Sequence, residues 1–279
     1  MLSQLLDVVS PAQTREDVFL GQNMHPQAFR VYGGQVLAQA LSVAVATVSE
    51  ERTVHSQHAY FLRRGRPGEP IVYEVERARD GLSFSSRRVV ALQRDKPIMV
   101  STLSFQEPSS GDDYQPDMPD VPPPQSLRSE RDLGLAAGNI DASFMITTGE
   151  DLDIRVVDPI DWENLQPREP QLQVWMKTNG PVPGARGVHQ SLLAYLSDAF
   201  LIDVCLVTHG RSFLDPGMQV ASLDHALWYH DDFRVDEWLL HTVHTERISG
   251  GRGLARGSFY TAEGKLVAST MQQGVMRFR

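Results

Sequence analysis

The sequence is poor in the residues and segments that mark several classes of protein. Its 279 residues include one cysteine, Cys205, which excludes a disulfide within the chain and any zinc or iron–sulfur site built from several cysteines. Cys205 lies between Val204 and Leu206, which predicts a buried, unreactive thiol. No uncharged apolar run approaches the roughly 18 residues of a membrane-spanning helix, and the first residues lack the basic start of a signal peptide. We therefore expect a soluble cytoplasmic protein.

Positive charge is also scarce. The 26 basic residues are outnumbered by 35 acidic ones, which gives a formal net charge of −9. This balance disfavours binding to nucleic acid or to an anionic membrane, although a few local arginines could still hold a small anion. The short basic run 63–66 is interpreted as a solvated loop, with a seat for a ligand phosphate as the less favoured alternative.

The chain is long enough for one large domain or two ordinary ones. Residues 107–141 are rich in proline, acids and small polar residues, which is typical of a linker in which almost nothing is buried. The predicted units are therefore an N-terminal repeat over residues 1–106, the linker, and a C-terminal repeat over residues 142–279.

Each unit shows the same order of elements. In the first, residues 31–49 carry no charge and are rich in alanine and leucine, which predicts a helix buried on all sides. Strand-like segments follow at 71–77, 85–93 and 98–106. One buried helix followed by long antiparallel strands predicts a curved sheet wrapped around that helix, an α+β arrangement.

The second unit repeats this order, with a helix-like segment at 189–202 and a hairpin formed by 252–261 and 265–272. The sequence around His225 resembles that around His58, at an offset of 167 residues. Ser269 similarly matches Ser101, at an offset of 168 residues. Two nearly equal offsets indicate an internal duplication.

Asp198 is the most unusual acid in the chain, because its helix is otherwise almost entirely apolar around it. An unpaired buried carboxylate costs several kcal/mol, so Asp198 is expected to be hydrogen-bonded, paired or used in chemistry. A structural role, in which it faces a wet groove or caps a loop, remains equally open on the residues alone.

Ser222 and Gln272 attract less notice by themselves. Strand alternation puts Ser222 and Asp224 on one face and His225 on the other, and neighbouring strand positions cannot form a catalytic triad. Gln272 ends the last predicted strand, on the same face as Thr270 and Ala268, where its amide could donate to a carbonyl or position a water. His241 and His244 lack a third ligand at a suitable spacing, which disfavours a metal site.

Several motifs, taken in order, resemble the acyl-CoA thioesterase II family between about residues 18 and 277. They are YGGQVLAQA (32–40), HSQHAYFL (55–62), RDGLSFSSRRV (79–89), SFQ (104–106), LSD (196–198), SLDH (222–225), DEWLL (236–240) and LVASTMQQGVMR (266–277).

This resemblance implies a double hotdog fold, in which each of two repeats wraps a curved antiparallel sheet around a central helix. It implies hydrolysis of fatty acyl-CoA to free acid and CoA, without a metal or other cofactor, and assembly into a homo-oligomer. It also implies that Asp198, Ser222 and Gln272 are the catalytic residues. We expect Asp198 to take a proton from a water that Ser222 and Gln272 help to orient. Direct attack by Asp198 on the thioester, which would form a mixed anhydride, is the less favoured mechanism.

The duplication places His55 opposite Ser222 and Gln39 opposite Asp198, so one active site per chain is expected. Two other functions stay open. One is a hotdog hydratase acting on enoyl- or hydroxyacyl-thioesters, which would need an acid–base pair such as His225 with an acid. The other is a non-catalytic acyl-CoA binding protein, which would not need Asp198.

Overall fold

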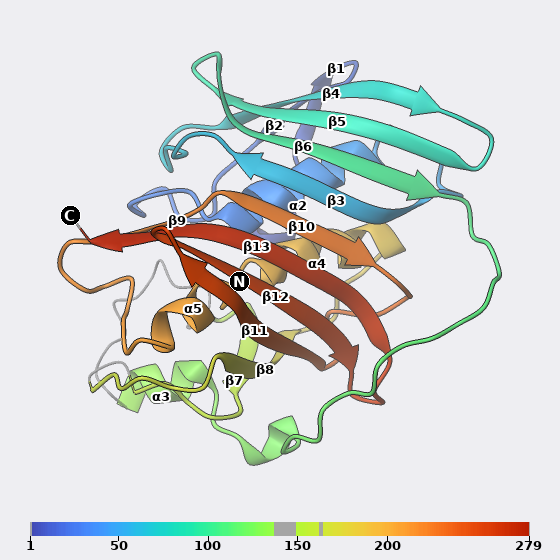
Figure 1. Cartoon of the computed structure of the whole chain (residues 1–279). Coiled ribbons are helices and arrows are strands. Elements are labelled where there is room, and N and C mark those ends of the chain that lie inside the picture. Colours follow the sequence, from blue (N-terminus) through green and yellow to red (C-terminus); the bar gives the residue numbers. More distant parts are fainter. Residues whose placement is uncertain (1, 137–148, 162–163, 279) are drawn as a thin grey trace.

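The computed structural model describes residues 2–136, 149–161 and 164–278, and its strands form one continuous antiparallel sheet (Figure 1). The strands are β1 (Ala12–Arg15), β2 (Val18–Gly21), β3 (Thr53–Phe61), β4 (Ile71–Asp80), β5 (Phe84–Gln93), β6 (Lys96–Gln106), β7 (Leu152–Val156), β8 (Gln171–Thr178), β9 (Met218–Ser222), β10 (Asp224–Tyr229), β11 (Leu239–Ser249), β12 (Arg252–Thr261) and β13 (Leu266–Phe278). Their order across the sheet is β1–β2–β4–β5–β6–β3–β10–β13–β12–β11–β8–β7, and β9 pairs with the end of β13. The helical segments are α1 (Leu2–Val8), α2 (Gly33–Val45), the 3₁₀ turn η1 (Pro124–Ser126), α3 (Glu130–Ala136), α4 (Arg186–Ser197) and α5 (Asp203–Val207).

The two halves meet where β3 and β10 run antiparallel, with His58 opposite Ala226. Each half contributes one long helix, α2 or α4, and Figure 1 shows both helices behind the strands. The helices also pack against each other. This arrangement confirms the double hotdog architecture that the repeated helix–strand order predicted.

The predicted central helix forms as α2, and ten of its thirteen residues are buried. A helix without charges can be enclosed by a sheet on one side and a second helix on the other at little electrostatic cost. The strands β5 and β6 are joined by a tight turn, in which Arg94 and Asp95 have φ values of 51° and 58°. Two consecutive positive φ angles fit the right-handed twist of a tight hairpin between β5 and β6.

The thiol of Cys205 is buried in α5, as its apolar neighbours predicted. Burial raises the pKa of this thiol, which keeps it protonated and unreactive. Within the part of the chain that the structure describes, no helix is both long and apolar enough to cross a membrane.

The proline-rich segment is largely exposed or half-buried, as expected, and Pro124 is the one buried residue among its described residues 107–136. The segment nevertheless lies against the second half of the molecule. The indole nitrogen of Trp175 donates a hydrogen bond to the Pro122 carbonyl at 3.0 Å. Three partly buried apolar residues of the segment, Met118, Val121 and Leu127, pack against Trp175, Leu240 and Tyr260. The boundary after residue 141 lies outside the described residues.

The helices of the two halves approach each other closely at Gly34. A Cβ atom on Gly34 would lie 2.3 Å from the carbonyl oxygen of Tyr195 and 2.5 Å from a ring carbon of Tyr32. The Tyr32 hydroxyl donates to the same Tyr195 carbonyl at 2.9 Å, and the two rings meet edge to face. Only glycine leaves room for the start of α2 to touch the backbone of α4.

We expect Gly34→Ala to destabilise the protein by about 1–3 kcal/mol, because the added methyl group overlaps a backbone atom that cannot rotate away. In an ordinary helix position the same change would be stabilising by roughly 1 kcal/mol, so the sign of the effect is diagnostic. The matched control is Gly68→Ala, since no heavy atom lies within 4 Å of that Cβ position. Urea denaturation measures both, and equal stability of the two variants would contradict the packing described.

A second buried feature of the sheet is His241 of β11, which is fully buried and stacks on Phe259 with ring centroids 4.0 Å apart. Neither ring nitrogen of His241 has a hydrogen-bond partner among the described residues. Burial lowers the pKa of His241 to about 3, and the nearby His225 adds to this effect. The folded protein therefore holds this imidazole in its neutral form.

Acidification is expected to destabilise the fold through this residue. An unfolded histidine titrates near pH 6.5, whereas His241 in the folded protein titrates near pH 3. Between these two pH values the unfolded state therefore binds one more proton than the folded state. The contribution of His241 to the free energy of unfolding is fully present above pH 6.5. It should fall by about 2 kcal/mol between pH 7 and pH 5. Thermal unfolding at several pH values should therefore show a shallower decline for His241→Leu than for the wild type. Parallel declines would rule out this contribution.

Candidate active site

Asp198 lies directly after α4, as its C-terminal cap, and points to the start of α2 in the other half of the molecule. Its Oδ2 atom accepts a hydrogen bond from the backbone N–H of Gly34 at 2.9 Å. The first turn of a helix carries partial positive charge and unpaired N–H groups, so it stabilises a carboxylate at this position. The other oxygen, Oδ1, is buried and has no hydrogen-bond partner among the described residues. The described residues therefore leave the lone pairs of this atom unused.

Ser222 and Gln272 are in direct contact. Ser222 ends β9 opposite Gly274 of β13, and Gln272 lies two residues earlier on β13 with its side chain buried. The Gln272 Nε2 atom donates a hydrogen bond to the Ser222 hydroxyl oxygen at 2.9 Å. That contact leaves one amide hydrogen of Gln272 and the hydroxyl hydrogen of Ser222 available to other groups.

His225 is the residue that sequence reasoning missed. Its Nδ1 atom lies 2.5 Å from Gln272 Oε1, and its Nε2 atom lies 3.0 Å from the Ser197 hydroxyl. An amide oxygen only accepts hydrogen bonds, so Nδ1 carries the proton and Nε2 is the acceptor when the ring is neutral. Burial lowers the pKa of His225, which favours this neutral ring. His225 therefore fixes the orientation of the Gln272 amide, with its nitrogen turned towards Ser222.

The expected separation of His225 from Ser222 was wrong. Ser222 lies opposite Gly274, and Ala226 lies opposite Met271. The segment from β9 to β10 therefore advances four residues while β13 advances three. The extra residue falls at Leu223, between β9 and β10. Such a bulge reverses the alternation beyond it and turns His225 onto the inner face with Ser222. Local alternation alone gave no signal of the break.

These contacts join two of the three predicted site residues, Ser222 and Gln272, directly. A chain of hydrogen bonds runs from Ser222 through Gln272 and His225 to Ser197, the residue before Asp198. The Asp198 side chain is not part of this chain and bonds the Gly34 N–H instead. A signal was available in the sequence, because Leu196-Ser197-Asp198 and Ser222-Leu223-Asp224-His225 both belong to the motifs quoted above.

A second acid lies near Asp198. The pKa of Asp203, at the start of α5, is raised to about 6 by burial and by the charge of Asp198, while Arg30 opposes the shift. Burial and Asp198 also raise the pKa of Tyr32 well above its usual range, so its hydroxyl stays protonated. The site is therefore a region of negative potential that Arg30 partly compensates.

The repeat alignment needs a correction of one residue. His58 is exposed and stacks against Trp228, whereas His225 is buried, so the two cannot be equivalent. Gln57 is the residue of β3 that faces inward at the equivalent position. It lies opposite Leu103, and in the second half His225 lies beside Gln272 in the same way. The offset of Ser101 and Ser269 fails in the same way, because Ser101 is buried and Ser269 bonds the exposed His230. Alignments based on short matches do not resolve a shift of one residue, although such a shift exchanges the faces of a strand.

The helix alignment was also wrong. Gln39 lies in the middle of α2, whereas Asp198 follows the last residue of α4. The first half nevertheless lacks the polar pair of the second. Gln57 and Leu103 occupy the positions that correspond to His225 and Gln272, so no second Gln272–His225 pair exists there.

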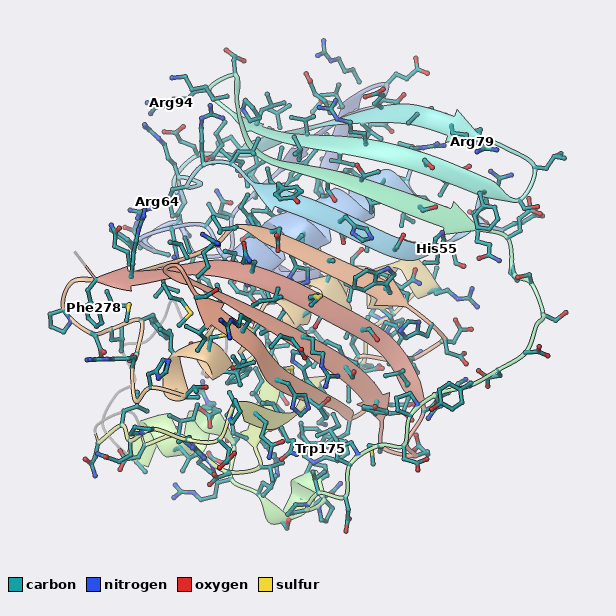
Figure 2. The ribbon with its side chains drawn as sticks, in the orientation of Figure 1. His55, Arg64, Arg79, Arg94, Trp175 and Phe278 are labelled. Carbon is teal, nitrogen blue, oxygen red and sulfur yellow. The ribbon has the colours of Figure 1, made fainter. Side chains whose placement is uncertain are left out.

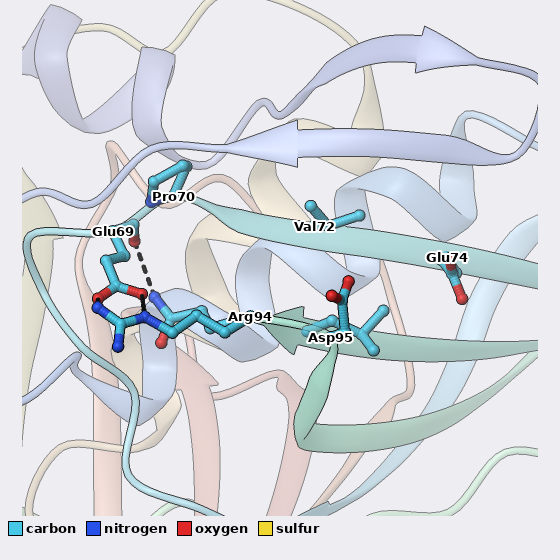
Figure 3. Close-up of a pocket in the computed structure, with 8 residues that line it drawn as sticks. Glu69, Pro70, Val72, Glu74, Arg94 and Asp95 are labelled. Carbon is cyan, nitrogen blue, oxygen red and sulfur yellow. Dashed lines mark hydrogen bonds and ion pairs between the residues drawn. The ribbon is translucent and has the colours of Figure 1, made fainter.

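A hollow at the far edge of the first half can be set aside. Figure 3 shows it beside the ion pair of Glu69 with Arg94, and Glu74 and Asp95 also line it. None of the residues around Asp198 lines this hollow, and its lining residues include more acids than bases. A surface of this sign does not suit an anionic ligand.

Comparison with known proteins identifies the family. A family model described as acyl-CoA thioesterase matches residues 165–275, and one described as acyl-CoA thioesterase N-terminal domain matches residues 20–106. The chain is 34% identical to acyl-CoA thioesterase 2 of Haemophilus influenzae over 284 aligned residues, which cover 100% of this chain and 98% of that protein.

Solved structures show the same likeness. An acyl-CoA thioesterase II from Mycobacterium marinum is 36% identical, with a TM-score of 0.81 and 98% of each chain covered. A hotdog-fold protein from Alicyclobacillus acidocaldarius is 18% identical, with a TM-score of 0.78 over 98% of this chain and 97% of its own, and shows the fold alone. The full-length match to the Haemophilus influenzae protein and the paired family models establish that the chain belongs to the acyl-CoA thioesterase II family.

Proposed function

We propose that this thioesterase hydrolyses medium- to long-chain fatty acyl-CoA to the free fatty acid and CoA, using Asp198, Ser222 and Gln272. The observation that carries the proposal is the pair of different environments at the Asp198 carboxylate. Oδ2 is held by the Gly34 N–H, and the buried Oδ1 has no partner among the described residues. An oriented carboxylate with one free oxygen is suited to act as a general base.

In the proposed reaction, Asp198 Oδ1 takes a proton from a water molecule whose oxygen attacks the thioester carbonyl carbon. The tetrahedral intermediate then breaks its C–S bond, and the departing CoA sulfur takes the proton back from Asp198. The products are a carboxylic acid and a thiol, so all atoms balance. Direct attack by Asp198 would instead form a mixed anhydride, and water that attacks its aspartyl carbon in a single turnover in ¹⁸O water would leave the label in the Asp198 carboxylate and an unlabelled Asp198 oxygen in the fatty acid, whereas the general-base route labels only the fatty acid.

Ser222 and Gln272 are assigned to orient the water or the thioester. The Gln272 nitrogen uses one hydrogen on Ser222 and has a second one to donate. A donor that is held in place before the reaction stabilises developing negative charge without reorganising. His225 supports this role as a positioning residue, because its bond to Oε1 keeps the amide from turning over.

The alternative functions have less support. A hydratase would need an acid–base pair of a histidine and a carboxylate at one site. His225 is instead bonded to an amide and a hydroxyl, while Asp224 accepts a hydrogen bond from the backbone N–H of Gln273. A non-catalytic binder would have no use for a buried carboxylate with a free oxygen, which costs energy to keep.

Asp198→Asn should lower kcat for palmitoyl-CoA by roughly 10²–10⁴-fold, because the amide cannot take a proton from water. The variant should fold, since the asparagine oxygen can still accept the hydrogen bond from Gly34. Release of free CoA thiol measures the rate. It also separates thioester hydrolysis from hydration or simple binding, which release no thiol.

The matched control is Asp112→Asn, which makes the same chemical change at an exposed position of the proline-rich segment. It should keep the wild-type rate. A folded Asp198→Asn protein that works at nearly the wild-type rate would exclude Asp198 as the base.

A further inference from the structure

Three arginines near the candidate active site lack the ion pairs that most other arginines of this acidic chain make. Arg66 and Arg94 both reach Glu69. In contrast, Arg30, Arg63 and Arg64 have no carboxylate within 4.0 Å among the described residues. Arg30 and Arg63 donate hydrogen bonds to carbonyl oxygens, and Arg64 lies over an aromatic ring. In a chain with 35 acidic residues, a group of unneutralised guanidinium groups is a local exception to the overall charge.

These arginines surround an exposed phenylalanine. The Arg64 guanidinium lies 4.4 Å from the centre of the Phe29 ring, and Phe29 is 78% exposed. Two loops carry the group, one before α2 and one after β3. The loops are held together by the Val31 N–H, which donates to the Gly65 carbonyl at 3.3 Å. Gly65 permits this contact, because a Cβ there would lie 2.9 Å from a Val31 methyl group. The exposed ring and the guanidinium groups are therefore held in one place.

This patch of Phe29, Arg30, Arg63 and Arg64 adjoins the site. Arg30 Nη1 donates to the Val220 carbonyl at 2.7 Å, two residues before Ser222. Its positive charge also opposes the rise in the pKa of Asp203 that burial and Asp198 cause.

The loop of Arg30 leads directly into Gly33, whose Cβ position would lie 2.8 Å from Asp198 Oδ2. In Figure 2, Arg64 lies at the outer edge of the molecule, towards the same end of the strands as Arg94 and Phe278.

We propose that this patch binds the 3′-phosphoadenosine diphosphate end of CoA. The inference rests on the proposed function, because it takes a CoA thioester as the substrate. Guanidinium groups bind phosphate through paired N–H donors, and they suit a ligand with several phosphates better than any other side chain does. The exposed Phe29 ring offers a surface on which a purine base can stack.

The shape of CoA fits this placement. The thioester and the phosphates lie at opposite ends of the long pantetheine arm, so the phosphates remain outside when the thioester reaches a buried carboxylate. The patch is exposed and borders the loop that leads to Asp198. It therefore accounts for how a chain of net charge −9 attracts a polyanionic substrate.

The test compares two substrates on two matched variants. R63Q/R64Q removes two charges from the patch. The control, R79Q/R128Q, removes two arginines that also have no carboxylate within 4.0 Å among the described residues. Figure 2 shows Arg79 towards the opposite end of the strands from Arg64. The substrates are palmitoyl-CoA and palmitoyl-pantetheine, which lacks the nucleotide and its phosphates. The measured quantity is the ratio of kcat/KM for palmitoyl-CoA to that for palmitoyl-pantetheine.

We expect this ratio to fall about tenfold or more in R63Q/R64Q, the loss that follows from removing charge-assisted contacts, and to stay at the wild-type value in R79Q/R128Q. An unchanged ratio in R63Q/R64Q, or an equal fall in both variants, would overturn the proposal.

If the wild type releases thiol from neither substrate, the proposed function fails. Calorimetric titration with 3′-phosphoadenosine 5′-diphosphate then tests separately whether the patch binds this nucleotide. Binding that R63Q/R64Q loses would support the patch, and no binding by the wild type would overturn it.

Discussion

The hydrogen bond from the Gly34 N–H to the Asp198 carboxylate ties the two halves of the molecule together at the candidate active site. It exists because the start of α2 can approach the end of α4 without a side chain between them. The same contact places a carboxylate where the partial charges of a helix end stabilise it. One close backbone approach thus serves packing, charge stabilisation and the orientation of the proposed base.

The sequence allowed much of the fold to be predicted, because helix burial and strand alternation are local patterns. The uncharged segment around Leu37 forms the buried helix α2, and the residues around Thr270 form an inward-facing row of the last strand. Asp198 could be singled out from its apolar neighbours alone. Features set by pairing between distant strands could not be predicted. The bulge at Leu223 and the inward turn of His225 depend on how β9 and β10 meet β13.

The duplicated fold has become asymmetric in its chemistry. The second half holds a chain of polar side chains from half-buried Ser222 to buried Ser197, and each member is bonded to the next. Such a chain fixes side-chain orientations, which suits a site whose donors need to be held in advance. The first half holds the N-terminus of α2, which bonds Asp198, and the basic patch around Phe29. In the function that we propose, the two halves supply different parts of one site.

The central claim is that each chain builds one site from two dissimilar halves, and a count of bound substrate tests it most directly. Isothermal titration with a non-hydrolysable thioether analogue of palmitoyl-CoA gives that count. The account predicts one molecule bound per chain, because Gln57 and Leu103 replace the His225–Gln272 pair in the first half. Two equivalent molecules bound per chain would contradict it.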